Sequence, residues 1–247
     1  MIPQPEVVLI AAVAALVLGA AKTSFPTAAL LVIPILTLRL EARMALGILM
    51  PLYVFADIVA ITSYRRGLNF ATALGLLPGA AAGMLVAVLV GQHLSAEIFN
   101  RVLGALILTT VGFTVLLRTN SDGVTRKLPR WGVPILGVAA GFATMIGNSG
   151  GPLVSIYLVL GGLANQSFVG TASIFYLLVN LTKVPLHLVV WQSVTWQQML
   201  TVSALVFPTA LVGTFIGRWI LPRVPVETFR RIVLTLAAVA AIRLLYI

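Results

Sequence analysis

The sequence contains no cysteine and very few charged residues. The lack of cysteine excludes disulfides, thiolate metal sites and a cysteine nucleophile. Charged residues make up 9% of the 247 positions and hydrophobic residues 60%, against about 25% and about 45–50% in average soluble proteins. So few charges could not cover the surface of a soluble fold, which excludes an ordinary cytosolic enzyme and a disordered chain.

The few charges that are present are mostly positive. Lysine and arginine number 16 and aspartate and glutamate 6, so the formal net charge is +10. On so apolar a chain, excess Lys and Arg are typical of residues that flank membrane spans, which argues against nucleic acid as a partner. The lipid bilayer is the expected surrounding.

Eight apolar stretches are long enough to enter a membrane, since a membrane helix needs roughly 20 apolar residues. Short loops join them, and no segment suggests a separate soluble domain. The sequence therefore predicts one all-α, polytopic membrane unit. The stretches cover residues 7–38, 44–64, 71–91, 98–117, 131–160, 167–190, 196–220 and 229–247.

Two of these stretches are too long for one span and carry a polar break at their centres. As continuous helices, residues 7–38 and 131–160 would measure about 45–48 Å, against a hydrocarbon core of about 30 Å. Residues 22–27 (Lys-Thr-Ser-Phe-Pro-Thr) interrupt the first, and residues 147–152 (Gly-Asn-Ser-Gly-Gly-Pro) the second. Because broken backbone at membrane depth must line a cavity or be buried in protein, each stretch is predicted to form a helical hairpin.

The two halves of the chain resemble each other at an offset of 123 residues. This offset aligns the break at 22–27 with residues 145–150, Gly47 with Gly170, and Asp57 with Asn180. We therefore expect a tandem duplication, with one membrane repeat in residues 1–123 and another in residues 124–247.

The distribution of Lys and Arg indicates how these repeats are oriented. If every stretch crossed once, alternate loops would carry six and seven basic residues, which is no bias. If both broken stretches return to their own side, the loops carry ten and three. Each repeat then has a hairpin plus three transmembrane helices, so the repeats are inverted and both termini lie on the periplasmic side. Paired broken helices in inverted repeats are typical of secondary transporters.

The breaks are candidate anion sites because a helix that begins there presents free N–H groups and a partial positive charge. We expect Ser24 to cap the helix entered at Pro26, and Asn148 or Ser149 to cap the one entered near Gly150. The alternative is that the breaks are kinks that only permit tight helix packing. The candidate substrate-binding residues at the breaks are Lys22, Thr23, Ser24, Phe25, Asn148, Ser149, Gly150 and Gly151.

Three charged residues are predicted at membrane depth, where a charge is costly and indicates function. They are Lys22, Asp57 and Lys183. Asp57 and Lys183 lie on equivalent helices of the two repeats, so we expect them to pair, as a structural ion pair or with Asp57 carrying a coupling proton. Asn180 lies one turn before Lys183 and joins the candidate substrate-binding residues.

Two rival functions stay open at this stage. Gly147-Asn148-Ser149-Gly150 fits the nucleophile motif of rhomboid intramembrane proteases, with His187 downstream as the base of a Ser–His dyad. A non-transporting membrane assembly partner is the other. We nevertheless expect no enzyme, no metal, no cofactor and no ATP-driven pump, because no Walker A loop, dinucleotide fingerprint or metal-ligand cluster is present. The oligomeric state stays open, a homodimer included.

Several of these elements together resemble the TauE/SafE (TSUP) permease family, over nearly the whole chain. The run 147–152 after Gly141-Phe142 is similar to the family's glycine-rich repeat element. Phe168-Val169-Gly170-Thr171-Ala172-Ser173 with Asn180, Lys183 and Pro185 is similar as well, and so is Ala56-Asp57 with Tyr64-Arg65-Arg66. The first break departs from the family's glycine-rich pattern.

This resemblance implies a transporter in the bacterial inner membrane, acting as an exporter. It implies a small sulfur-containing anion as substrate, such as sulfite, a sulfonate or sulfoacetate. The residues themselves predict only that the substrate is an anion, since helix N-termini and lysines suit sulfonate, sulfate, sulfite or phosphate equally.

Overall fold

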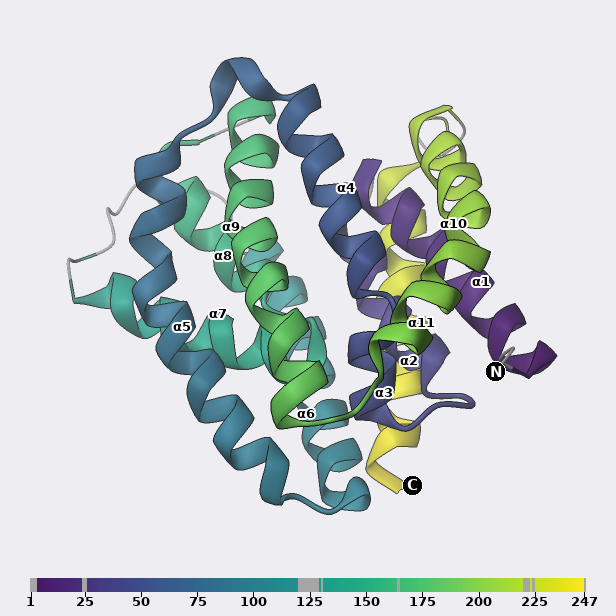
Figure 1. The fold of residues 1–247 in the computed structure, drawn as a ribbon. Helices are drawn as coiled ribbons and strands as arrows, with labels where there is room; N and C mark the ends of the chain where they lie inside the picture. Colours follow the sequence, from purple (N-terminus) through teal and green to yellow (C-terminus); the bar gives the residue numbers. More distant parts are fainter. Residues whose placement is uncertain are drawn as a thin grey trace.

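The computed structural model describes residues 4–23, 26–119, 129, 131–163, 165–219, 223 and 225–246. These residues form helices and no strand (Figure 1). The all-α membrane fold expected from the sequence is confirmed. The helices of the first half are α1 (Pro5–Thr23), η1 (Pro26–Leu31), α2 (Val32–Leu36), α3 (Ala42–Ile48), α4 (Met50–Ser63), η2 (Arg65–Gly67), α5 (Phe70–His93) and α6 (Ala96–Thr119). Those of the second half are α7 (Gly132–Gly147), α8 (Gly151–Leu160), α9 (Asn165–Pro185), η3 (Leu186–Val190), α10 (Trp196–Trp219) and α11 (Val226–Tyr246).

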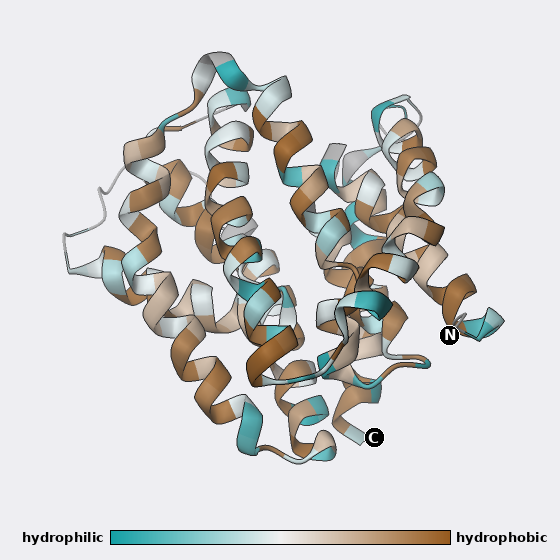
Figure 2. Cartoon of the chain, in the orientation of Figure 1, coloured by the Kyte–Doolittle hydropathy of each residue, from teal (hydrophilic) through white to brown (hydrophobic). Residues whose placement is uncertain are grey.

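Five of the described helices are long and apolar enough to cross a membrane, and α3 with α4 makes a sixth if that pair, bent by 41°, is one span. Figure 2 shows most helices coloured as hydrophobic along their length. Large apolar side chains such as Leu85 on α5 and Phe215 on α10 are more than half exposed, as expected of surfaces that face lipid.

The first and last stretches differ in apolar length. Helix α1, before the first break, has the length and hydropathy of a span over Pro5–Lys22. The last stretch, expected to cross at 229–247, forms α11 but lies outside the five candidates. Its four charged residues lower its apolar character: Glu227, Arg230, Arg231 and Arg243.

Helices of the first half pack in pairs against helices of the second half. Helix α1 lies against α10, and α5 lies against α7. Helices α4 and α9 pack together, as do α6 and α11. Each major helix of residues 1–123 therefore has a principal partner in residues 124–247, so neither half presents a separate core.

Close backbone contact at glycines makes two of these pairs possible. A Cβ added to Gly141 on α7 would lie 2.1 Å from the carbonyl oxygen of Ala80 on α5. A Cβ on Gly213 of α10 would lie 2.0 Å from the carbonyl oxygen of Leu16 on α1. Small residues at such crossings are how membrane helices gain packing energy when lipid and side chain are equally apolar.

We predict that Gly141→Ala destabilises the fold, because the new methyl group must displace the α5 backbone. Overpacking of this kind costs about 1–3 kcal/mol. The measurement is the thermal unfolding midpoint of the purified protein in detergent. Gly112→Ala on α6 is the matched control, since nothing lies within 4 Å of its added Cβ. An equal midpoint shift in both variants would show that the crossing does not depend on Gly141.

Candidate functional site

A buried polar cluster lies where α4 and α9 pack together. Asp57 comes from the middle of α4, and Asn180 and Lys183 come from the second half of α9. Asp57 and Lys183 are both 0% exposed and Asn180 is 2% exposed. The ends of α1 and α7 complete the cluster with Lys22 and Asn148. Helices before both breaks thus reach the same two central helices.

The Asp57 carboxylate is held from two sides. Its Oδ1 accepts a hydrogen bond from Lys22 Nζ and forms an ion pair with it, and Oδ2 accepts from Asn180 Nδ2 at 2.8 Å. Asp57 and Asn180 are separated by 123 positions, the offset that relates the two halves. Residues that correspond in the sequence therefore meet directly in space.

Lys183 has a different set of partners. Its Nζ donates to the Thr144 carbonyl oxygen at 3.0 Å and to Asn148 Oδ1 at 2.8 Å. Both acceptors lie at the C-terminal end of α7, where the helix dipole is negative and favours a cation. Asn148 ends that helix in the left-handed conformation, with φ 52°. The Lys183 ammonium therefore interacts favourably with the negative end of the α7 helix dipole.

This geometry corrects the expected Asp57–Lys183 pair. The partner of Asp57 is Lys22, and Lys183 is bound by neutral oxygens of α7. The spacing of residues along α9 placed Lys183 on the correct face, but no residue pattern indicated that the Thr144 carbonyl oxygen would bind it. Thr144 is a site residue that sequence analysis missed, because its contribution is a backbone oxygen.

The expected helix caps at the second break are also wrong. The residue before α8 is Gly150, and no side chain caps that helix. Ser149 Oγ instead donates backward to the Ala143 carbonyl oxygen at 3.2 Å, and Asn148 ends α7. Gly150 is confined by Thr144, whose Oγ1 would lie 2.0 Å from an added Cβ. Gly151 opens α8, and its added Cβ would lie 3.8 Å from the Tyr176 hydroxyl.

The first break differs from the second. The expected cap Ser24 and its neighbour Phe25 lie outside the described residues, as does the side chain of Thr23. The chain after them begins as a 3-10 helix at Pro26, not as an α-helix. The anion site expected between two α-helix N-termini is therefore not built in that form.

The charges in the cluster do not balance. Two lysines and one carboxylate lie in it, which gives 2 − 1 = +1 when all three are ionised. The Lys22 ammonium also lies 5.4 Å from the centre of the Tyr176 ring, whose negative face attracts it. Two buried acceptor atoms in the cluster, Asn180 Oδ1 and Thr144 Oγ1, have no hydrogen-bond partner among the described residues.

A Ser–His dyad is not formed. The Ser149 hydroxyl donates to Ala143, and His187 Nδ1 is 2.9 Å from the Ser193 hydroxyl instead. His187 is 0% exposed and lies at the far end of α9, in the π-helical turn η3. The arrangement that the protease alternative requires is therefore absent from the described residues.

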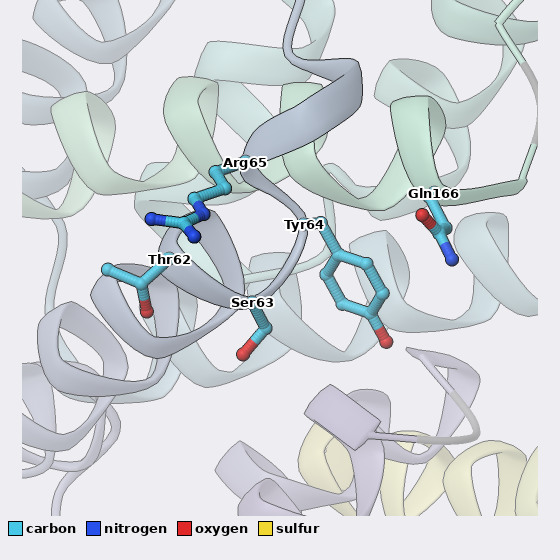
Figure 3. A pocket seen from close by; sticks show the side chains of 5 residues that line it. All are labelled: Thr62, Ser63, Tyr64, Arg65 and Gln166. Carbon is cyan, nitrogen blue, oxygen red and sulfur yellow. The ribbon is translucent and has the colours of Figure 1, made fainter.

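The surface has a pocket near the C-terminal end of α4. A pocket of about 400 Å³ is lined by Thr62, Ser63, Tyr64, Arg65 and Gln166 (Figure 3). A second, of about 570 Å³, lies beside it between η2 and the turn from α8 to α9. Neither pocket includes a residue of the buried cluster.

Comparison with known proteins identifies one family. The sequence model described as "Sulfite exporter TauE/SafE" matches residues 9–244. Neither a curated protein nor a solved structure matches the chain. The matched range includes both breaks and every residue of the cluster.

We predict that Lys22 and Asp57 depend on each other for stability. Lys22→Met leaves a buried, uncompensated carboxylate, and breaking a buried pair in this way costs about 3–5 kcal/mol. Adding Asp57→Asn should recover part of the loss, because the amide oxygen still accepts from Asn180. Thermal unfolding midpoints of the single and double variants measure this coupling.

The exposed pair between Arg101 and Glu97 supplies the control for this experiment. Glu97→Gln should change stability by no more than about 0.5 kcal/mol, as surface substitutions usually do. The interpretation fails if the double variant is no more stable than Lys22→Met alone.

Proposed function

This chain belongs to the sulfite exporter TauE/SafE family, and we propose that it exports a small sulfur-containing oxyanion across the bacterial inner membrane. It is a multi-pass membrane transporter of the sulfite-exporter type. The substrates we propose are sulfite, a sulfonate or sulfoacetate, bound beside Lys22, Asp57, Asn180 and Lys183.

The observation that carries the proposal is that the buried Lys183 has no acidic partner among the described residues. A charge in a low-dielectric interior is costly unless an opposite charge balances it. Within the cluster, Asp57 neutralises Lys22, and Lys183 has only uncharged acceptors. An anion that approached Lys183 would supply the missing negative charge. Helix α8 starts three residues after Asn148, which binds Lys183, and Gly151 at that start lies near the Tyr176 hydroxyl.

Proton coupling follows from the same charge balance. When Asp57 takes up a proton, Lys22 loses its counter-charge and the cluster changes from +1 to +2. Proton binding at Asp57 and anion binding therefore favour each other. The proton raises the positive charge of the cluster, and the bound anion balances that charge. A dianion carried with one proton still moves one negative charge outward, which an inside-negative membrane potential favours by about 2.3 kcal/mol per 100 mV.

The proposed architecture has two inverted repeats, residues 1–123 and 124–247, with both termini periplasmic. The alternating packing of α1 with α10 and of α5 with α7 supports it, since exchanging the halves exchanges these two pairs. The hydrogen bond between Asp57 and Asn180 supports it as well, because corresponding residues meet where a twofold axis would pass. A central site shared by two inverted halves suits alternating access.

We predict that sulfoacetate or sulfite raises the thermal unfolding midpoint of the purified protein and that Lys183→Gln abolishes the rise. At a concentration of 100 times Kd, binding stabilises the folded protein by about 2.7 kcal/mol. Lys183→Arg should retain part of the shift because it keeps the charge, which separates loss of binding from loss of folding. Arg223→Gln, at an exposed arginine outside the cluster, should show the same rise in unfolding midpoint with the anion as the unmodified protein.

Uptake of the same anions into proteoliposomes completes this test. Flux that requires Lys183 supports transport, whereas a protein that neither binds nor moves any sulfur oxyanion or carboxylate would support a membrane assembly partner instead. Proteolysis of a membrane reporter that depends on Ser149 and His187 would overturn the proposal in favour of a protease.

We further predict that anion affinity falls as pH rises through the range in which Asp57 loses its proton. The direction follows from the charge balance, since the ionised carboxylate lowers the net positive charge of the cluster. Asp57→Asn carries no proton to lose, so its anion affinity should not vary over that range. Isothermal titration of both proteins at a series of pH values measures this. A parallel pH dependence in the two would assign the effect to another group.

A further inference from the structure

The two ends of the α4–α9 pair correspond in sequence but differ in structure. At the offset of 123, Tyr64 corresponds to His187 and Gly47 corresponds to Gly170. The contacts correspond as well: an added Cβ on Gly47 would lie 3.1 Å from His187 Nδ1, and one on Gly170 would lie 3.3 Å from the Cβ of Tyr64. Gly47 of the first half thus lies against His187 of the second half, and Gly170 of the second half lies against Tyr64 of the first half.

The His187 end is closed. His187 is 0% exposed, and its ring is held by the Ser193 hydroxyl and by the edge of the Trp191 ring, whose centre is 5.1 Å away. Trp191 Nε1 in turn donates to the Val88 carbonyl oxygen of α5 at 3.2 Å. Val194, which also faces Gly47, is 4% exposed. Side chains of the second half therefore close this end against Gly47 and the backbone of α5.

The Tyr64 end is open. Tyr64 lines the pocket of about 400 Å³ that Figure 3 shows, together with Arg65 and Gln166. We name it the Arg65 pocket. Tyr64 and Asp57 lie on one chain segment, 64 − 57 = 7 positions apart, which in a helix is about 10 Å. The pocket is thus two turns from the buried cluster.

The groups that line the Arg65 pocket suit an oxyanion. Thr62 and Ser63 use their hydroxyl protons on carbonyl oxygens of their own helix. The remaining donors are the Arg65 guanidinium, the Tyr64 hydroxyl and the Gln166 amide. No carboxylate lines the pocket, and Arg65 forms no ion pair with any residue that the structure describes. An unpaired guanidinium can bind a sulfonate or phosphate group through two parallel hydrogen bonds.

From this difference we propose that the Arg65 pocket is the entrance through which the substrate oxyanion reaches the buried cluster, and that the His187 end is the closed exit. The proposal rests on the proposed function and adds a second, outer anion site to it. In the opposite state, the exit opens as His187 leaves Gly47, and the entrance closes as the Tyr64 side chain covers the Arg65 pocket. The occupant is a free oxyanion; the phosphate of an anionic lipid has the same chemistry and must be distinguished by experiment.

The absence of cysteine makes a direct test possible, because each single-cysteine variant carries one thiol. Ser63→Cys places it in the Arg65 pocket, and Val194→Cys places it behind His187. Gln197→Cys, an exposed position just beyond the closed end, is the control for reagent access. The proteins are placed in nanodiscs of phosphatidylcholine and treated with a membrane-impermeant maleimide, with and without sulfoacetate. Sulfite is avoided because it reacts with maleimides.

The proposal expects fast labelling of Ser63→Cys that sulfoacetate slows at least threefold. Arg65→Gln in the same background should remove this protection. Without anion, Val194→Cys should react at least tenfold more slowly than Gln197→Cys, and sulfoacetate should narrow that gap by populating the opposite state. Labelling in inside-out and right-side-out vesicles then shows that the two thiols react from opposite faces.

Several results would overturn the proposal. Protection that survives Arg65→Gln, or that appears only when phosphatidylglycerol replaces phosphatidylcholine, would assign the pocket to another ligand. Equal labelling of Val194→Cys and Gln197→Cys without anion would show that the His187 end is not closed. If sulfoacetate stabilises the unmodified protein but does not protect Ser63→Cys, the entrance alone is wrong. If it does not bind at all, the proposed function fails as well.

Discussion

Burial of the Asp57 carboxylate is the constraint around which the centre of the molecule is arranged. An ionised carboxylate removed from water needs a counter-charge and hydrogen-bond donors, or the chain does not fold around it. Lys22 supplies the charge from the end of α1, and Asn180 supplies a donor from α9. Two segments far apart in the sequence, α1 and α9, are thereby drawn to one point of α4.

The broken helices follow from the same requirement. A continuous helix hydrogen-bonds its own backbone, whereas one that stops inside the protein leaves carbonyl oxygens to be satisfied. At the end of α7, the Thr144 carbonyl receives the Lys183 ammonium and the Asn148 amide N–H, both at 3.0 Å. The break therefore places a lysine at the centre of the protein without an acidic partner, and this is the charge that the proposed anion would balance.

The cluster and the surface pockets together suggest how such a site is reached. The cluster itself is closed, since Asp57 and Lys183 are fully buried. The glycine contacts at the two ends of α4 and α9 are equivalent, but one end is filled by His187 and Trp191 while the other opens at Arg65. The two glycine contacts are equally close and differ only in the exposure of their surroundings, and the proposed entrance and exit rest on that difference.

The membrane class, the positions of both breaks and the charges of the cluster could be predicted from the amino-acid sequence alone. These properties are local: a hydrophobic run, a Gly-Pro interruption and an isolated Lys or Asp in apolar surroundings can each be read from neighbouring residues. The offset of 123 also brought Asp57 and Asn180 into correspondence, although nothing in the sequence showed that they touch.

Which charges pair could not be predicted in this way, because it depends on how the helices pack. Lys183 was the expected partner of Asp57, and the pairing with Lys22 instead depends on how the ends of α1 and α7 lie across α4 and α9. The backbone oxygen of Thr144 and the caps at the second break were invisible for the same reason. Every residue has a carbonyl group, so which one is positioned to accept a hydrogen bond from a lysine depends on where the helix ends in space, not on residue type.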